Sequence, residues 1–175
     1  MSGRAKIPIV ARPRLCLDSN VFLAIIVPDA TRASREDVRG AERLLESLKK
    51  GEIAAVASVM VLAEICWVFD REQKSGFDMA RAALEQGFAG QLDILPVDAD
   101  LAVASAVYRR RYYSKTNSFS YNDGIILATA IRGGAGGLVT TDPHLLAATE
   151  IPTFRPSSFP PKPRGPETRQ SQSSG

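Results

Sequence analysis

Short apolar runs alternate along the chain with longer segments in which apolar residues recur at helical spacing. A short run that is almost entirely apolar is typical of a strand in a parallel sheet covered on both faces. Four runs fit this pattern: Arg14–Leu17, Ile53–Ser58, Leu92–Val97 and Leu138–Thr141. The segment Pro152–Phe154 is a candidate for a last edge strand.

The segments between these runs predict helices. Residues 35–49 place Val, Ala and Leu at positions 38, 41, 44, 45 and 48, which is a helix with one buried face. Further helices are predicted at 19–27, where Pro28 ends the helix, at 59–72, 77–88 and 99–108, from Asn122 onward and after Pro143. Strands that alternate with helices indicate a three-layer α/β/α fold with a short central parallel sheet of four or five strands.

A length of 175 residues suggests one domain, and 45% hydrophobic residues suffice for a real core. The interpretation is a basic N-terminal arm at 1–13, a domain at 14–155 and a tail at 156–175. The tail is rich in Pro and Ser, and Phe159 is its only large apolar residue. It cannot bury enough surface to offset its ordering entropy, so we expect it to be disordered.

Charge and cysteine content exclude several classes of protein. The formal charge of +3 is too small to argue for nucleic-acid binding by itself. No apolar run approaches the ~18 residues of a membrane span, and the N-terminus lacks a secretory pattern, so we expect a cytoplasmic protein without a membrane partner. Cys16 and Cys66 have no nearby Cys or His, which argues against zinc and favours buried thiols.

Acidic residues stand at the ends of the best-defined apolar segments. Asp18 and Asp142 follow predicted strands, and Asp123 lies at the start of a predicted helix. Glu64 lies inside the otherwise apolar segment VMVLAEICWVF. Because the carboxyl ends of parallel strands meet at one edge of a sheet, we expect these acids to lie around one crevice.

Clustered carboxylates need a positive charge nearby. A pair ~4 Å apart repels by on the order of 4 kcal/mol at an effective dielectric constant of 20. Either some acids hold protons or a divalent cation keeps them ionised, and oxygen ligands favour Mg²⁺ or Mn²⁺ over zinc. Such an ion lowers the pKa of a bound water and neutralises phosphoryl charge, which points to phosphodiester hydrolysis.

A structural interpretation also exists for three of the four acids. Asp18 and Asp123 are favourable helix caps, and Asp142 before Pro143 fits a turn. Glu64 has no comparable structural reason to stand in its apolar segment.

Four motifs occur in a characteristic order: LDSNVFLAI around Asp18, SVMVLAEI around Glu64, NDGIILATAI around Asp123 and LVTTDPHL around Asp142. Together they resemble the PIN-domain ribonucleases, especially the VapC type of toxin–antitoxin systems, over residues 14–154. The resemblance implies a Mg²⁺- or Mn²⁺-dependent endoribonuclease that cuts single-stranded or loop RNA. It also implies an antitoxin protein that covers the site, and a homodimer formed through a helical face.

The resemblance further implies roles for individual residues. Asp18 and Asp123 match the principal metal ligands, and Glu64 and Asp142 match the remaining catalytic acids. The supporting polar positions are Ser19, Asn20 and Thr140. This chain departs from the family at Gly124, where Ala often follows the third acid, and we expect Gly to loosen that turn slightly.

A basic and aromatic stretch precedes Asp123 and forms a candidate RNA-binding rim beside the metal. Its members are Arg109, Arg110, Arg111, Tyr112, Tyr113 and Lys115. The alternative is a solvated helix end, where cations favour the helix dipole. His144, the single histidine, is expected at the surface, and Trp67 is expected to anchor the core.

Three other functions compete with the nuclease interpretation. A catalytically silent PIN-like module that binds RNA or protein is the alternative, although it has no need of four clustered carboxylates. A phosphatase of the haloacid-dehalogenase type would need a second Asp where Asn20 stands, and a receiver domain would need a Lys near the last strand, where none occurs.

Overall fold

The computed structural model describes residues 12–31, 33–73, 81–82, 84, 88 and 90–159. Within these residues, five parallel strands form one sheet in the order β3–β2–β1–β4–β5. Their bounds are Arg14–Leu17 (β1), Ala54–Ser58 (β2), Leu92–Leu95 (β3), Gly137–Val139 (β4) and Thr153–Phe154 (β5). All the predicted strands are therefore confirmed, including the edge strand, with ends that shift by a few residues.

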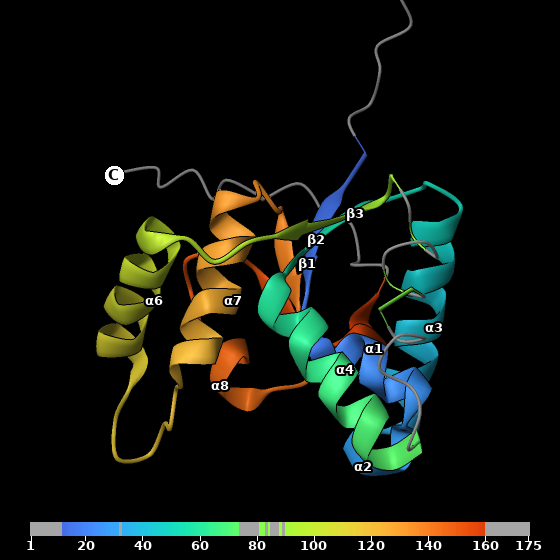
Figure 1. Cartoon of the computed structure of the whole chain (residues 1–175), viewed down its shortest axis with the longest axis horizontal. Helices are drawn as coiled ribbons and strands as arrows, with labels where there is room; N and C mark the ends of the chain where they lie inside the picture. Colours follow the sequence, from blue (N-terminus) through green and yellow to red (C-terminus); the bar gives the residue numbers. More distant parts are fainter. Residues whose placement is uncertain are drawn as a thin grey trace, which may run out of the picture.

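Helices cover the sheet on both sides, and the predicted three-layer fold is confirmed (Figure 1). Helices α6 and α7 lie on one side, and α1, α2 and α3 lie on the other. The bounds are Ser19–Ile26 (α1), Pro28–Thr31 (α2), Arg35–Lys49 (α3), Val59–Gln73 (α4), Ala99–Tyr112 (α6), Tyr121–Arg132 (α7) and Pro143–Leu146 (α8). The helix predicted at 77–88 falls mostly outside the described residues.

Local signals explain where several helices begin. Asp18 caps α1 by accepting from the backbone N–H of Ser19, and the hydroxyl of Ser58 accepts from the N–H of Met60 at the start of α4. Helix α6 continues to Tyr112, beyond the predicted end at 108, because no residue in the basic stretch breaks it. Arginines in its last turn also interact favourably with the helix dipole.

The core lies between the central strands and the helices packed against them. Leu17, Val56 and Leu138 of three adjacent strands are fully buried, as are Leu44 of α3 and Ile65 of α4. Burial of apolar side chains from both faces of the sheet is what a parallel sheet requires. None of the helices in the described part of the chain is long and apolar enough to cross a membrane.

Helices α6 and α7 approach each other closely at Gly124. Ser105 of α6 is buried, and its hydroxyl donates to the backbone oxygen of Tyr121 at 2.7 Å. A Cβ added at Gly124 would lie 2.5 Å from the backbone oxygen of Ser105. Close packing against Ser105 is therefore a reason for glycine at position 124, beyond the looser turn that the sequence predicts.

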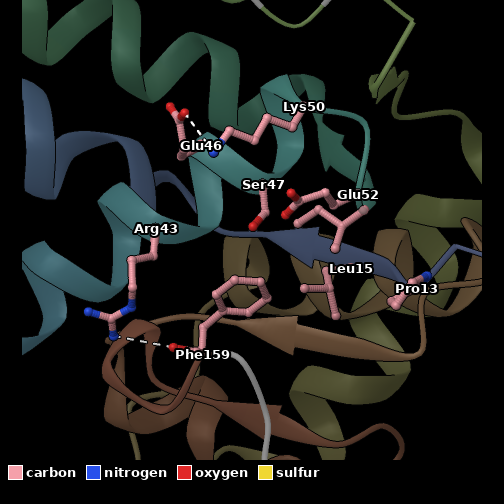
Figure 2. A pocket seen from close by; sticks show the side chains of 9 residues that line it. Pro13, Leu15, Arg43, Glu46, Ser47, Lys50, Glu52 and Phe159 are labelled. Carbon is pink, nitrogen blue, oxygen red and sulfur yellow. Dashed lines mark hydrogen bonds and ion pairs between the residues drawn. The ribbon is translucent and has the colours of Figure 1, made fainter.

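The prediction that disorder begins at Pro156 is wrong for its first residues. Pro156–Ser158 form a short 3₁₀ helix, η1, and Phe159 is only 8% exposed. In Figure 2 the ring of Phe159 points toward Leu15 of β1, while Arg43 of α3 donates to its backbone oxygen at 3.2 Å. Composition described the tail as a whole, whereas its first residues pack against α3. Residues 160–175 and 1–11 lie outside the described residues.

An ion pair between the partly exposed Arg155 and the buried Asp37 fastens this C-terminal segment to α3. The fully buried carboxylate of Asp37 accepts from the Arg155 guanidinium at 2.5 Å and from the N–H of Ser157 at 3.3 Å. Ser34 donates to the same carboxylate at 2.9 Å. Burial alone would raise the pKa of Asp37, but the hydrogen bonds from Arg155, Ser157 and Ser34 outweigh it and lower the pKa to about 2.

We predict that Gly124→Ala lowers the free energy of unfolding by about 1–3 kcal/mol, because the new methyl group forces α6 away from α7. Chemical denaturation measures this. Gly136→Ala is the matched control, since a Cβ at Gly136 meets only the backbone oxygen of Arg14 at 3.7 Å. Equal stability of the two variants would contradict the packing role of Gly124.

We predict that Arg155→Ala lowers the free energy of unfolding by about 2–3 kcal/mol at neutral pH, because it leaves Asp37 buried without its charge partner. The folded pKa of Asp37 lies below its ordinary value of 3.8, so the stabilisation is present above that pH and is lost as the pH falls toward 2. The gap between wild type and variant should therefore close in acid. Arg39→Ala, an exposed change on the same helix, serves as the control.

Candidate active site

The four predicted acids line a single cavity of about 290 Å³. Asp18 follows β1, and Asp142 follows β4, its neighbour in the sheet. The chain order of the sheet reverses between these two strands, which is where open α/β sheets form ligand crevices. Glu64 reaches the cavity from α4 and Asp123 from the first turn of α7. The tertiary structure thus brings together four acids that are far apart in sequence.

Asp18 is the most buried of the four and the most heavily hydrogen-bonded. Its carboxylate accepts from the N–H of Ser19 at 2.7 Å, from Asn20 Nδ2 at 3.0 Å and from the hydroxyl of Thr140 at 2.6 Å. These donors are the three supporting positions predicted from the sequence. Burial, followed by the negative charge of Glu64, raises the pKa of Asp18 to about 6 against the effect of these hydrogen bonds.

Thr140 also connects two of the acids. Its side chain is fully buried, and its hydroxyl donates to Asp18 while it accepts from the backbone N–H of Asp142 at 2.9 Å. The backbone N–H of Asp18 donates to the oxygen of Val139 at 3.1 Å. The ends of β1 and β4 are therefore held in one fixed relation.

Glu64 and Asn122 form a pair across the cavity. The side-chain amide of Asn122 donates to Glu64 Oε1 from the first turn of α7. Burial raises the pKa of Glu64, hydrogen bonds from Ser19 and Asn122 act against this, and the charges of Asp123 and Asp142 raise it further. Asn122 is a lining residue that the sequence alone did not predict. Its place beside Asp123 in the first turn of a helix is the only local signal of that role.

Asp123 and Asp142 also serve as helix caps. Asp123 Oδ2 accepts from the N–H of Ser120 at 2.6 Å while Ser120 Oγ accepts from the N–H of Asp123, which is a capping box. Asp142 Oδ1 accepts from the N–H of His144 at 2.7 Å. The interpretation of Asp123 and Asp142 as helix caps is therefore correct. Both residues also line the cavity.

The donor set suits a hard divalent cation. Among the described residues that line the cavity, the polar groups are carboxylates, the amides of Asn20 and Asn122, the hydroxyl of Ser19 and the indole N–H of Trp67, without Lys, Arg or His. Asn122 Oδ1 is buried and lacks a hydrogen-bond partner in the described structure. In the same part of the chain, no three acidic, His or Cys side chains are grouped closely enough to hold a metal as they stand. Mg²⁺ needs only one or two carboxylates and keeps several waters, so this set fits it.

The chain matches the family model of the PIN domain over residues 15–151, which is most of its length. It belongs to the PIN-domain family. The family membership expected from the four motifs is thereby confirmed, and the acid cavity lies within the matched region. No curated protein sequence matches the chain closely enough to count as a relative.

Several solved structures share this PIN fold. A toxin–antitoxin complex from Klebsiella pneumoniae is 20% identical with a TM-score of 0.57, over 81% of this chain and 97% of that one. FitAcB from Neisseria gonorrhoeae is 24% identical with a TM-score of 0.57, over 81% and 97%. VapC20 of Mycobacterium tuberculosis, described as a toxin that cleaves the sarcin–ricin loop, is 18% identical with a TM-score of 0.57, over 79% and 98%. At these identities the likeness establishes the fold.

The predicted RNA-binding rim does not line the acid cavity of the PIN domain. Tyr112 packs against Phe119, with ring centroids 5.2 Å apart, and its hydroxyl contacts Glu150, which also pairs with Arg111. The guanidinium of Arg109 stacks on Tyr113 and, with 4.6 Å between centres, on Tyr121. Arg109, Arg111, Tyr112 and Tyr113 thus have partners within the chain, and Arg110, Arg111, Tyr113 and Lys115 are exposed. RNA contact by this stretch stays a prediction.

The expectation that Trp67 anchors the core is wrong, because its side chain is 60% exposed and lines the acid cavity. Ile65 and Cys66 supply the buried face of α4 instead. His144 is half-exposed, and its Nε2 lies 3.0 Å from the hydroxyl of Ser118, which fits the surface role expected for it.

We predict that Asp18→Asn stabilises the metal-free PIN domain, relative to wild type, progressively as the pH rises from 4 to 7. The folded pKa of about 6 lies above the ordinary 3.8, so the wild-type fold loses stability as the pH rises through this interval, and an amide does not. The difference in unfolding free energy should change by about 1–3 kcal/mol between these pH values. Denaturation at several pH values in chelator measures it.

Asp98→Asn is the control for this experiment. Hydrogen bonds from Arg132 and from the N–H of Leu101 lower the pKa of Asp98 to about 2. Its contribution to stability is therefore lost only below about pH 4, so the effect of Asp98→Asn should stay nearly constant between pH 4 and 7. A pH-independent difference for Asp18→Asn would show that its carboxylate is not strained in the folded state.

Proposed function

We propose that this PIN domain is a divalent-metal-dependent endoribonuclease that hydrolyses RNA phosphodiester bonds. One observation carries the proposal: four carboxylates from four separate segments line one cavity, and the described lining residues include no side-chain cation. Burial, and after it the negative charge of neighbouring acids, raises the pKa of Asp18 and of Glu64, which is a cost that a bound cation would remove. A purely structural set of caps would have no reason to share one cavity.

Each polar residue at the cavity has a proposed role. Asp18 and Asp123 would be the principal ligands of Mg²⁺ or Mn²⁺, with Glu64 and Asp142 as the remaining acids. A bound ion of this kind supplies an acidified water and neutralises charge on a phosphoryl oxygen. Asn20, Ser19 and Thr140 orient the Asp18 carboxylate. Asn122 holds Glu64 through its amide N–H, and its buried Oδ1 lacks a hydrogen-bond partner in the described structure.

We further propose that the nuclease is the toxin of a toxin–antitoxin pair and that it forms a homodimer. Support comes from the fold, because similar solved structures include a toxin–antitoxin complex and the FitAcB assembly. VapC20, which has the same fold, is described as a toxin that cleaves the sarcin–ricin loop. The partner would be an antitoxin protein that covers the cavity, and the substrate would be single-stranded or loop RNA.

The alternative is a catalytically silent PIN module that binds RNA or protein. It is favoured by the capping bonds of Asp123 and Asp142, which give these acids a structural purpose, and by the absence of a close metal-binding group among the described residues. The two functions make opposite predictions about cleavage.

We predict that the wild-type protein cuts labelled RNA only in the presence of Mg²⁺ or Mn²⁺. Asp18→Asn and Asp123→Asn should each lower the cleavage rate by roughly 100-fold or more, as the loss of a charge-stabilising group does in other enzymes. Glu46→Gln, an exposed acid on α3, is the matched control and should cleave normally. Cleavage in chelator, or full activity of both Asn variants, would falsify the nuclease assignment.

The melting temperature of the same proteins gives an independent measure of metal binding. Added Mg²⁺ or Mn²⁺ should raise that of the wild type and of Glu46→Gln, since a ligand that binds only the folded state stabilises it. It should leave that of Asp18→Asn nearly unchanged. If metal stabilises the wild type yet RNA stays intact, the silent-module alternative is correct.

A further inference from the structure

Trp67 stands at the mouth of the acid cavity. It lies three residues after Glu64 on α4, so the two side chains project from the same side of the helix. Both line the cavity, and Trp67 remains 60% exposed. It is also the single tryptophan of the sequence. An indole this exposed beside a set of carboxylates calls for an explanation other than core packing.

Arg71 lies one helical turn after Trp67 on α4, and its side chain contacts the indole ring. The centre of its guanidinium is 4.6 Å from the centroid of the indole ring, and the same group pairs with Glu72 at 2.6 Å. A guanidinium over an indole face is an attractive cation–π contact that holds the ring in place. It also puts a positive charge beside a cavity whose described lining contains none.

A nucleic-acid substrate needs attraction from outside the acid cluster. The carboxylates repel a phosphate backbone, whereas stacking of a base on an aromatic face does not depend on the charge of the backbone. The binding of single-stranded nucleic acid typically combines such a stacking face with nearby Arg or Lys. Trp67 and Arg71 supply this combination at the edge of the cavity.

The neighbours of Trp67 favour a base over a protein partner. On the exposed side of α4, the residues one turn away are Ala63, Asp70 and Arg71, which are small or charged. The core of a protein interface is usually a contiguous apolar patch depleted of charge. A single indole set among charges fits one flat, planar group better than a hydrophobic protein surface.

We propose that Trp67 stacks on a base of single-stranded RNA adjacent to the phosphate held at the acid cavity, and that Arg71 contacts the backbone beside that base. The inference rests on the proposed nuclease function and adds a residue that positions the substrate. Stacking would place one nucleotide at a fixed distance from the acids and so define which phosphate enters the cavity.

The fluorescence of Trp67 reports on this contact directly, because the chain has no other tryptophan. The full-length protein is titrated with cleavage-resistant, phosphorothioate-linked 2′-O-methyl decamers of A, of U, and of abasic sugar with the same backbone. Base stacking predicts quenching by the A and U decamers and none by the abasic one. Equal fluorescence changes with all three decamers would overturn the proposal.

Substitutions separate stacking from simple apolar contact. Trp67→Ala and Trp67→Leu should each weaken binding of fluorescein-labelled A decamer roughly tenfold, measured by anisotropy, whereas Trp67→Phe keeps a ring and should lose less. Arg71→Ala should weaken binding and reduce its dependence on salt. Val103→Ala on α6, an exposed apolar position away from the cavity, is the control. Unchanged affinity in Trp67→Ala would overturn the proposal, and circular dichroism verifies that each variant is folded.

Cleavage assays on the same proteins test the nuclease function separately from the role of Trp67. Metal-dependent cleavage by wild type without quenching by any decamer would overturn the role of Trp67 and leave the nuclease intact. The absence of both cleavage and quenching would reject the nuclease function and this inference together. If Trp67→Ala binds and cuts RNA normally but no longer binds a co-purified protein, Trp67 belongs to a protein-docking surface and the stacking proposal is wrong.

Discussion

The burial of a negative charge at the end of the central strand is the constraint on which this structure depends. Asp18 follows β1, is nearly inaccessible to solvent and lies in a cavity with three other acids. A buried carboxylate costs several kcal/mol unless hydrogen bonds or a cation compensate it. Here Ser19, Asn20 and Thr140 supply the hydrogen bonds, and a pKa that remains raised shows that they do not compensate it fully.

The sheet order follows from the same arrangement. Because β1 lies between β2 and β4, segments distant in sequence end beside Asp18. Thr140 couples the end of β4 to Asp18, and Asn122 couples the start of α7 to Glu64 on α4. Asp18 and Glu64 are therefore each held by a contact from a different element, whereas Asp123 and Asp142 are held as caps of α7 and α8. This rigidity is what a site needs when its groups must keep their geometry while like charges repel.

A second buried aspartate secures the C-terminal segment against α3. Asp37 in α3 is as buried as Asp18, yet its pKa is lowered because Arg155 stands beside it. The contrast between these two aspartates shows how the environment decides the state of a carboxyl group. Asp37 is paired with a cation of the chain, Arg155, and serves stability. Asp18 lacks such a partner among the described residues of its cavity and is available for a ligand.

Local pattern in the sequence was sufficient for the strands, most helix starts and the order of the four acids, because hydrophobic periodicity and capping preferences act over only a few residues. Family motifs added the supporting roles of Ser19, Asn20 and Thr140. Only the tertiary structure decided that Asn122 binds Glu64 and that Trp67 faces solvent. It also decided that Phe159 packs beside β1 and that the missing side chain of Gly124 leaves room for Ser105. These contacts join segments 16 or more residues apart, or depend on which face of a helix the rest of the chain covers, and no local pattern encodes either.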